Sequence, residues 1–281
     1  MIKKIASLLF GLSSVWQPLG AEASQATSAN SDRWMIFERV ASDGKPLVVI
    51  ARTGNADARR LLLNGRATVV TCRTDPANVN DRGMPGGTER LYAIEDKLND
   101  EPAVLAAGAI HVASVTGQGQ RRMFIVHRDP LDLSWLLRSD PIQGFSCDAS
   151  DVQDRQALIQ LITPSLLETQ LNGDQSVIAS LQKHGDDGRA PRKTDFWFYG
   201  QRESLESLFG DLEVHGFSVD HWLSGPTGVV LSRKMPVDLE AFQELTPVIV
   251  DAVEKSKVDY DGWETMVVSQ TSTSTDGRKG H

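Results

Sequence analysis

Cysteine is scarce in this sequence of 281 residues, which contains only Cys72 and Cys147. Neither has a second cysteine or a histidine at the spacing of metal-binding motifs, and this argues against a zinc centre. We expect the two cysteines either to bond to each other or to remain two buried thiols. An oxidising compartment would favour the disulfide.

The motifs of common enzyme classes are also missing. There is no Gly-x-Ser-x-Gly elbow and no His-Glu-x-x-His helix. Gly117-Gln118-Gly119 lacks the third glycine of a dinucleotide site, so it is interpreted as a hairpin turn. The loop Gly83–Gly87 has no lysine for phosphate binding, although with Arg82 and Arg90 it could line a small-molecule or peptide cleft. No catalytic set and no cofactor is predicted.

Long apolar runs are lacking as well. The uncharged run Ile5–Trp16 follows two lysines and has about the length of a signal-peptide core, which is too short to span a bilayer. Ala21-Glu22-Ala23 fits a cleavage site. We expect residues 1–23 to be a signal peptide cleaved near Ala23 and residues 24–31 to be a polar tether. The mature protein would be periplasmic or secreted, without a permanent membrane anchor. A buried N-terminal helix is the less favoured alternative, because the run has no amphipathic period.

Charge is unevenly distributed along the chain, whose formal net charge is −8. Between Asn172 and Gln270 there are 17 acidic and 9 basic residues, whereas Ser24–Leu171 has 18 and 16. An acidic C-terminal half argues against direct nucleic-acid binding, since phosphate backbones attract lysine and arginine. It permits a basic protein partner, and a solvated acidic surface is the alternative.

The first part of the chain, residues 32–148, is predicted to be an α+β domain with a mainly antiparallel sheet and one or two helices. An Asp43-Gly44 turn indicates a hairpin between two short apolar runs. Thr88 is expected to cap a helix. Further strands are expected over 67–72, 103–116, 122–127 and 145–147.

This part contains the short motifs Trp34, Gly83-Met84-Pro85, Glu89 and Ile94-Glu95-Asp96-Lys97-Leu98. With them it resembles a bacterial domain family of unknown function, one sometimes found fused in front of the domain type described below. The resemblance covers about Asp32–Asp148 and implies no activity.

Residues 149–171 are predicted to be a helical linker, and residues 172–270 a second domain. Asn172-Gly173-Asp174 suggests a break, after which Asp174 would cap a helix over 175–183. The elements that follow have the order β-α-β-β-α-β, typical of a ferredoxin-like sandwich with both long helices on one sheet face. Gly262, between Asp261 and Trp263, suggests a close approach of the backbone to a bulky group. Trp263 and Phe242 are interpreted as core, and residues 271–281 as a disordered tail.

Four motifs stand out in the second domain: Leu181-Gln182-Lys183-His184-Gly185-Asp186, Asp195–Tyr199, His215-Gly216-Phe217-Ser218-Val219 and the signature Tyr260-Asp261-Gly262-Trp263-Glu264-Thr265. With these motifs the domain resembles the RraB family, the B-type protein regulators of ribonuclease E. The resemblance spans about Asn172–Gln270 and implies a small acidic protein that inhibits the nuclease by binding it, without catalytic residues. The nuclease is cytoplasmic, whereas an export signal is expected here.

Our leading hypothesis is an exported, non-enzymatic binding or regulatory protein, with a cytoplasmic inhibitor of ribonuclease E as the alternative. An enzyme of unrecognised type would need converging groups such as His215, His221 and Asp220. His111 and His127 fall in strand patterns and are interpreted as packed or edge residues. The oligomeric state is not predicted.

A partner-binding face is expected on the acidic sides of two helices, opposite their apolar stripes. A basic partner would contact Glu203, Glu206, Asp211 and Glu213 on one helix and Glu240, Glu244, Asp251 and Glu254 on the other.

Overall fold

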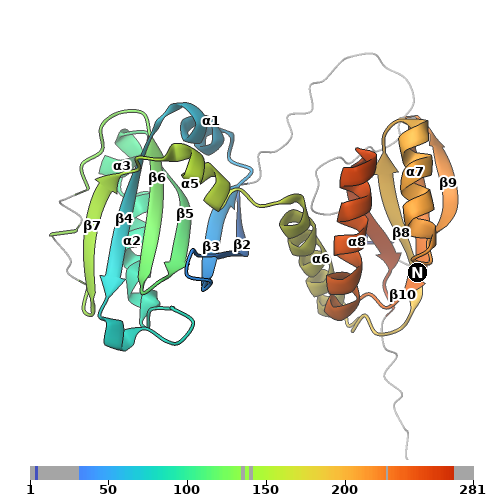
Figure 1. Ribbon diagram of the computed structural model, residues 1–281, viewed down its shortest axis with the longest axis horizontal. Helices are drawn as coiled ribbons and strands as arrows, with labels where there is room; N and C mark the ends of the chain where they lie inside the picture. Colours follow the sequence, from blue (N-terminus) through green and yellow to red (C-terminus); the bar gives the residue numbers. More distant parts are fainter. Residues whose placement is uncertain (1–3, 6–31, 134–136, 139–141, 226, 269–281) are drawn as a thin grey trace, which may run out of the picture. The chain divides into compact units, whose positions relative to one another are not determined.

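A computed structural model describes residues 4–5, 32–133, 137–138, 142–225 and 227–268 of the chain (Figure 1). The chain divides into two compact units, one formed by Gln25–Pro164 and the other by Ser165–His281 with Met1–Ser24. Apart from Lys4 and Ile5, the expected signal peptide, the polar tether and the tail at 271–281 lie outside the described residues. No helix in the described ranges is long and apolar enough to cross a membrane.

The N-terminal unit is built on one antiparallel sheet with the strand order β2-β3-β5-β6-β4-β7. The expected hairpin is β2–β3, and Gly44 adopts the positive φ of 77° that its turn requires. The strands are β2 (Arg33–Val40), β3 (Pro46–Thr53), β4 (Arg66–Thr74), β5 (Ile110–Gly117), β6 (Gln120–His127) and β7 (Phe145–Asp151).

Both faces of this sheet carry a hydrophobic core, because neighbouring side chains of a strand point to opposite sides. On β6, Phe124 and Val126 pack with α1 (Ala56–Asn64) and α5 (Arg155–Ile162). Met123 and Ile125 pack on the other face with residues of η2 (Thr88–Leu91), α2 (Tyr92–Asp100) and α3 (Pro102–Ala106). Figure 1 shows these two helical groups on opposite sides of the sheet. A further 3₁₀ turn, η1, covers Pro76–Asn78.

Two expectations for this unit were wrong, and one helix was missed. Thr88 is not a helix cap, because it is the first residue of a 3₁₀ turn. The cap position is Gly87, which has no side chain to accept a hydrogen bond. Residues 103–116 are not one strand, since α3 precedes β5. The helix α1 was missed; Asn55 caps it by accepting a hydrogen bond of 2.9 Å from the Ala58 N–H.

The C-terminal unit has an antiparallel sheet in the order β1-β11-β8-β10-β9. Apart from the two-residue β1 (Lys4–Ile5), the fourth, first, third and second strands of the unit lie side by side, as in a ferredoxin-like sandwich. This confirms the expected fold class. The strands are β8 (Arg192–Tyr199), β9 (Ser218–Ser224), β10 (Thr227–Met235) and β11 (Asp259–Met266), and the helices are α6 (Leu166–Lys183), α7 (Arg202–Glu213) and α8 (Leu239–Ser256).

Three helices cover one face of this sheet, with α8 in contact with both α6 and α7 (Figure 1). Phe196 and Phe198 of β8 point toward them and are fully buried. The rings of Phe242 and Trp263 stack with their centroids 4.4 Å apart, which confirms that both belong to the core.

The predicted break at Asn172-Gly173-Asp174 was wrong, because α6 runs through these residues without interruption. Ser165 caps this helix: its hydroxyl accepts from the Glu168 N–H, while the Glu168 carboxylate accepts from the Ser165 N–H. The expected domain boundary at Asn172 therefore lies inside a helix. Pro164 does interrupt the preceding helical segment, as expected.

Candidate functional site

A line of acidic side chains runs along the outer surface of α8. Glu240, Glu244, Asp251 and Glu254 are exposed and occupy positions i, i+4, i+11 and i+14, which fall on one side of a helix with 3.6 residues per turn. Within the described ranges, none of the four forms a hydrogen bond or ion pair. We call these four residues the α8 acidic stripe.

The four acids expected on α7 divide into two groups. Glu203 and Glu213 are exposed. In the part of the chain described, neither carboxylate forms a hydrogen bond or an ion pair. Glu206 pairs with Arg202 at 2.7 Å, so its charge is balanced within the helix. Asp211 is half-buried and forms an ion pair of 2.9 Å with Lys255 of α8, and this hydrogen bond raises the pKa of Lys255. Asp211 therefore joins the two helices rather than facing a partner.

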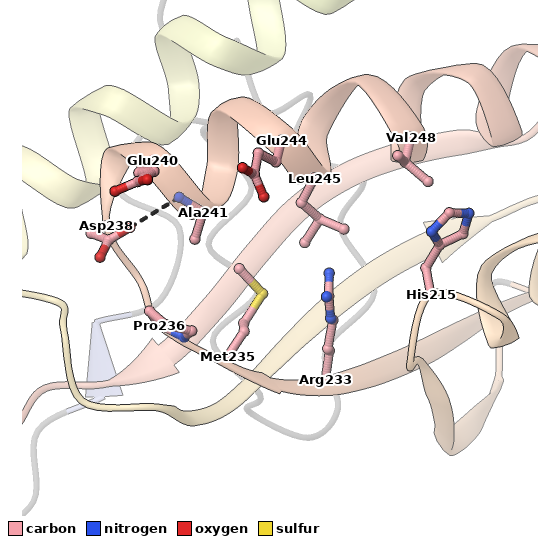
Figure 2. Close-up of a pocket in the computed structure, with 10 residues that line it drawn as sticks. All are labelled: His215, Arg233, Met235, Pro236, Asp238, Glu240, Ala241, Glu244, Leu245 and Val248. Carbon is pink, nitrogen blue, oxygen red and sulfur yellow. Dashed lines mark hydrogen bonds between the residues drawn. The ribbon is translucent and has the colours of Figure 1, made fainter.

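A pocket of about 440 Å³ opens beside the stripe, between α8 and β10 (Figure 2). Its apolar surface comes from Met235, Leu245 and Val248. Charged groups surround that surface: Glu244 reaches in from α8, Arg233 rises from β10, and His215 lies beyond the end of α7. Pro236, Asp238, Glu240 and Ala241 complete the lining.

Arg233 occupies a position that the strand pattern reserves for the core. Val229, Leu231 and Met235 of β10 are buried and point toward the helices, and Arg233 shares their side of the strand. It is half-buried, and its guanidinium lies 5.8 Å from the ring centroid of Phe217. Our reading of the sequence missed this residue. Alternate residues of this strand are apolar except at this position, and that interruption of the pattern could have revealed the arginine.

The signature Tyr260-Asp261-Gly262-Trp263-Glu264 forms β11, in which it has a structural role. Trp263 is buried in the core, and Tyr260 stacks on Phe198 with centroids 5.0 Å apart. The chain bulges between Tyr260 and Gly262, and Gly262 takes a φ of 101°. A Cβ at Gly262 would meet nothing within 4 Å, so the expectation of a close backbone approach was wrong. The glycine is required by the backbone angle.

Asp174 is the buried polar centre of this unit. It is 3% exposed, and its two carboxylate oxygens accept hydrogen bonds from Trp263 Nε1 at 2.7 Å and Thr246 Oγ1 at 2.6 Å. Burial raises the pKa of Asp174 to about 6, although the two hydrogen bonds oppose the shift. These bonds tie α6, α8 and β11 together around the signature tryptophan.

The residues considered for catalysis do not converge. His215 lines the pocket on the helical side of the sheet. His221 pairs in register with Val230, whose side chain faces away from the helices. Asp220 accepts hydrogen bonds from Lys193 at 2.7 Å and shares one of 2.8 Å with His221, and these partners lower its pKa. The described residues contain no group of three His, Cys, Asp or Glu side chains able to hold a metal ion.

The glycine loop of the N-terminal unit does line a pocket, of about 650 Å³, formed with the β2–β3 and β5–β6 turns. Gly83, Gly119 and Lys45 are among the residues that line it. Neither Arg82 nor Arg90, the two arginines considered for a cleft at this loop, is among the lining residues. Arg90 instead donates to the Gln143 carbonyl at 3.1 Å.

The histidines of the N-terminal sheet are packed, as expected. His111 is 3% exposed, with Nε2 3.1 Å from Ser114 Oγ, and burial lowers its pKa to about 4. His127 is also buried, with Nε2 2.9 Å from Thr68 Oγ1. These contacts fix both rings inside the unit.

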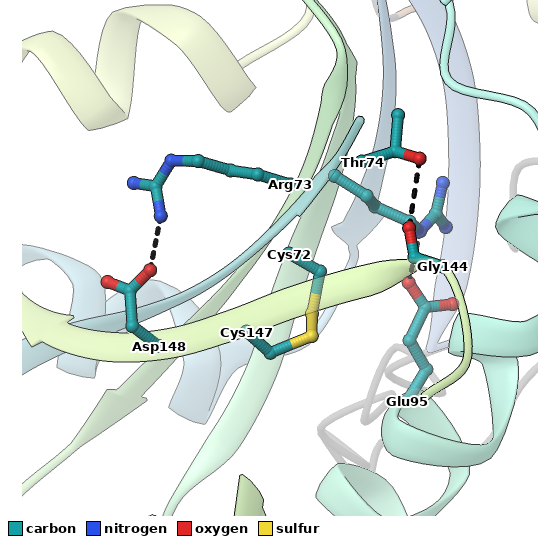
Figure 3. The surroundings of a disulfide bond; sticks show 8 residues. Cys72, Arg73, Thr74, Glu95, Gly144, Cys147 and Asp148 are labelled. Atoms are coloured by element: carbon teal, nitrogen blue, oxygen red, sulfur yellow. Dashed lines mark hydrogen bonds and ion pairs between the residues drawn. A yellow bond between two sulfur atoms is a disulfide. The ribbon is translucent and has the colours of Figure 1, made fainter. Parts of the chain in front are cut away.

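Cys72 and Cys147 are bonded to each other (Figure 3). They are direct partners on the neighbouring strands β4 and β7, with Cα atoms 4.1 Å apart. Arg73 forms an ion pair with Asp148 beside the bond. The disulfide therefore fastens the last strand of the N-terminal sheet to its neighbour.

Comparison with known proteins finds a family match within the C-terminal unit. Residues 172–265 match the family model described as Regulator of ribonuclease activity B, which confirms the resemblance found in the sequence. The family is one of regulators. No curated protein matches the sequence. Among solved structures, an unknown protein from Galdieria sulphuraria aligns at 14% identity over 73% of this chain and 99% of its own, with a TM-score of 0.20. A likeness at that score carries no functional argument.

Proposed function

We propose that this chain is a non-enzymatic regulatory protein whose C-terminal unit binds a basic protein through the outer surface of α7 and α8. The α8 acidic stripe carries the proposal, because its four exposed carboxylates lie on one line of a helix and none forms an ion pair within the described residues. One of them, Asp251, contributes to the raised pKa of Lys255 by its charge. The match of residues 172–265 to a family of regulators supports the same class of function. We further propose export, with cleavage near Ala23, which N-terminal sequencing of the protein purified from cells would test.

Unpaired surface charges of one sign act mainly on the rate of association. A basic partner would be attracted before contact, and the attraction would weaken as salt shortens the screening length to about 8–10 Å near physiological ionic strength. Glu213, Asp251 and Glu254 suit a test because they are exposed and free of ion pairs in the described part of the chain. Asp211 does not, since its reversal would break the contact with Lys255.

The experiment compares two triple variants that change the net charge equally. In one, Glu213, Asp251 and Glu254 become lysine. In the other, the exposed acids Glu38, Asp96 and Asp100 of the N-terminal unit become lysine. A partner is captured by cross-linking in intact cells, and its association rate is measured at low and high salt. We expect the first variant to associate about tenfold or more slowly at low salt, with a smaller difference at high salt, and the second to behave as wild type. Equal rates for the two variants would contradict the proposal.

A ribonuclease as the partner is the second candidate, favoured by the description of the matching family. Inhibition of ribonuclease E by the full chain in a cleavage assay would support it. The same two triple variants separate a specific contact from general electrostatics: only the variant with changes on α7 and α8 should lose inhibition. Undiminished cleavage at saturating concentrations of the chain would exclude this partner.

A further inference from the structure

The pocket between α8 and β10 contains opposite charges that do not neutralise each other. Arg233 and Glu244 both face it, from β10 and α8 respectively (Figure 2). Among the residues described, neither side chain has a hydrogen bond or an ion pair. His215 and Glu240, which also line the pocket, are equally free of side-chain partners there. The pocket therefore presents a guanidinium and a carboxylate that can each form hydrogen bonds and an ion pair with a ligand.

Two other arginines in the same unit have an acidic partner, whereas Arg233 has none among the described residues. Arg192 is paired with Asp186, and Arg202 with Glu206 at 2.7 Å. A half-buried guanidinium without a counter-ion is partly desolvated and gains from an added anion. Its planar fork matches a carboxylate, which it can bind through two parallel hydrogen bonds.

The remaining surface of the pocket fixes the character of such a ligand. Met235 and Leu245 are each 4% exposed, and with Val248 they form an apolar patch between the charged groups. Glu244 offers a carboxylate to a cation on the α8 side. The volume of about 440 Å³ lies in the range of small-molecule sites. A purely cationic ligand would be repelled by Arg233, and a purely anionic one by Glu244.

We propose that this pocket binds a small zwitterion with an apolar body, namely a free apolar α-amino acid or a dipeptide. The ligand's carboxylate would bind Arg233, its ammonium group would bind Glu244, and its side chain would cover Met235, Leu245 and Val248. The pocket shares Glu240 and Glu244 with the α8 acidic stripe. The test of the proposed contact with a basic protein instead changes Asp251, Glu254 and Glu213, which do not line the pocket.

Calorimetry on the full chain tests the proposal with matched ligands. Leucine, methionine and leucyl-leucine carry both charges, leucinamide lacks the carboxylate, and N-acetylleucine lacks the ammonium group. We expect binding of a zwitterion, weakened about tenfold or more in leucinamide and in N-acetylleucine. Tighter binding of leucine than of leucyl-leucine would identify the free amino acid as the ligand, and the reverse order would identify the dipeptide. No binding of any zwitterion at millimolar concentration would overturn the proposal.

Substitutions of Arg233 and Glu244 test which of them binds each charged group of the ligand. Arg233→Gln should weaken leucine binding about tenfold or more and leave leucinamide unaffected, whereas Lys234→Gln removes the same charge from the exposed neighbour and should change neither. Glu244→Gln should weaken leucine but not N-acetylleucine, with Glu254→Gln as its control. Thermal denaturation checks that each variant is folded. If Arg233→Gln fails to fold, Arg233→Lys replaces it, and the loss of the fork should still weaken leucine selectively. Equal effects at Arg233 and Lys234 would refute the assignment.

Discussion

Replacing Asp174 with asparagine should remove a pH dependence from the stability of the C-terminal unit. The pKa of Asp174 is raised from 3.8 to about 6 by burial. Between about pH 4 and pH 6, the folded state keeps a proton that the unfolded state has lost, so the free energy of unfolding falls as pH rises through this window. Above it, the buried carboxylate is charged, and the accumulated loss is about 3 kcal/mol.

Asparagine keeps the shape of the side chain but cannot ionise. Its carbonyl can still accept from Trp263 Nε1, and its amide can donate to Thr246 Oγ1, whose hydroxyl is free to turn. The exchange also changes stability by an amount that does not depend on pH. Beyond that amount, the stability of the variant relative to wild type should improve by about 2 kcal/mol between pH 4 and pH 7. Asp259→Asn, on the exposed start of β11, should show no comparable change.

Urea unfolding at steps between pH 4 and pH 8 measures the difference, and amide hydrogen exchange in β8 and β11 assigns the transition to this unit. Trp263→Phe provides an independent check. It keeps an aromatic ring in the core but removes the Nε1 donor to Asp174, so it should cost about 1–3 kcal/mol and move the window to higher pH. A relative stability of Asp174→Asn that stays constant across the pH range would refute the reasoning.

Two further predictions concern stability. Replacing both Cys72 and Cys147 with alanine should lower the free energy of unfolding of the N-terminal unit by about 2–5 kcal/mol, because the bond closes a loop between residues 75 positions apart; an unchanged denaturation midpoint would contradict this. Gly262→Ala should cost about 1–3 kcal/mol through its φ of 101°, although space is free around it. Gly210→Ala, in the interior of α7 with equally free space, should instead gain about 0.5–1 kcal/mol, and equal urea midpoints for the two variants would show that the bulge relaxes.

The C-terminal fold could be predicted from local patterns because its elements follow them closely. The apolar stripe Leu205, Leu208 and Leu212 is buried as a helix of period 3.6 requires. The error at Asp174 has a non-local cause. Asn172-Gly173-Asp174 has the composition of a turn, but Asp174 finds its partner in Trp263, 89 residues away. Sequence spacing contains no information about such a contact.

The candidate site was predictable only in part. The acidic positions on α8 could be placed by counting, since helical spacing alone decides which residues share a side. The involvement of Asp211 with Lys255 could not, because it depends on how α7 packs against α8. The pocket joins His215, Arg233 and Glu244 from three elements, so its existence follows from the tertiary fold. Similarly, α1 is short and contains Arg59 and Arg60, which obscured its apolar side.

The position of the disulfide also determines how the N-terminal unit responds to mechanical force. The chain leaves this unit through β7 and α5 before it reaches Ser165. Tension along that route would peel β7 from β4, beginning where Asp151 lies opposite Thr68. Four residue pairs would separate before the strain reached the covalent bond between Cys147 and Cys72, where peeling must stop. For the same reason, a protease that cut the chain once between these two residues would leave both fragments attached.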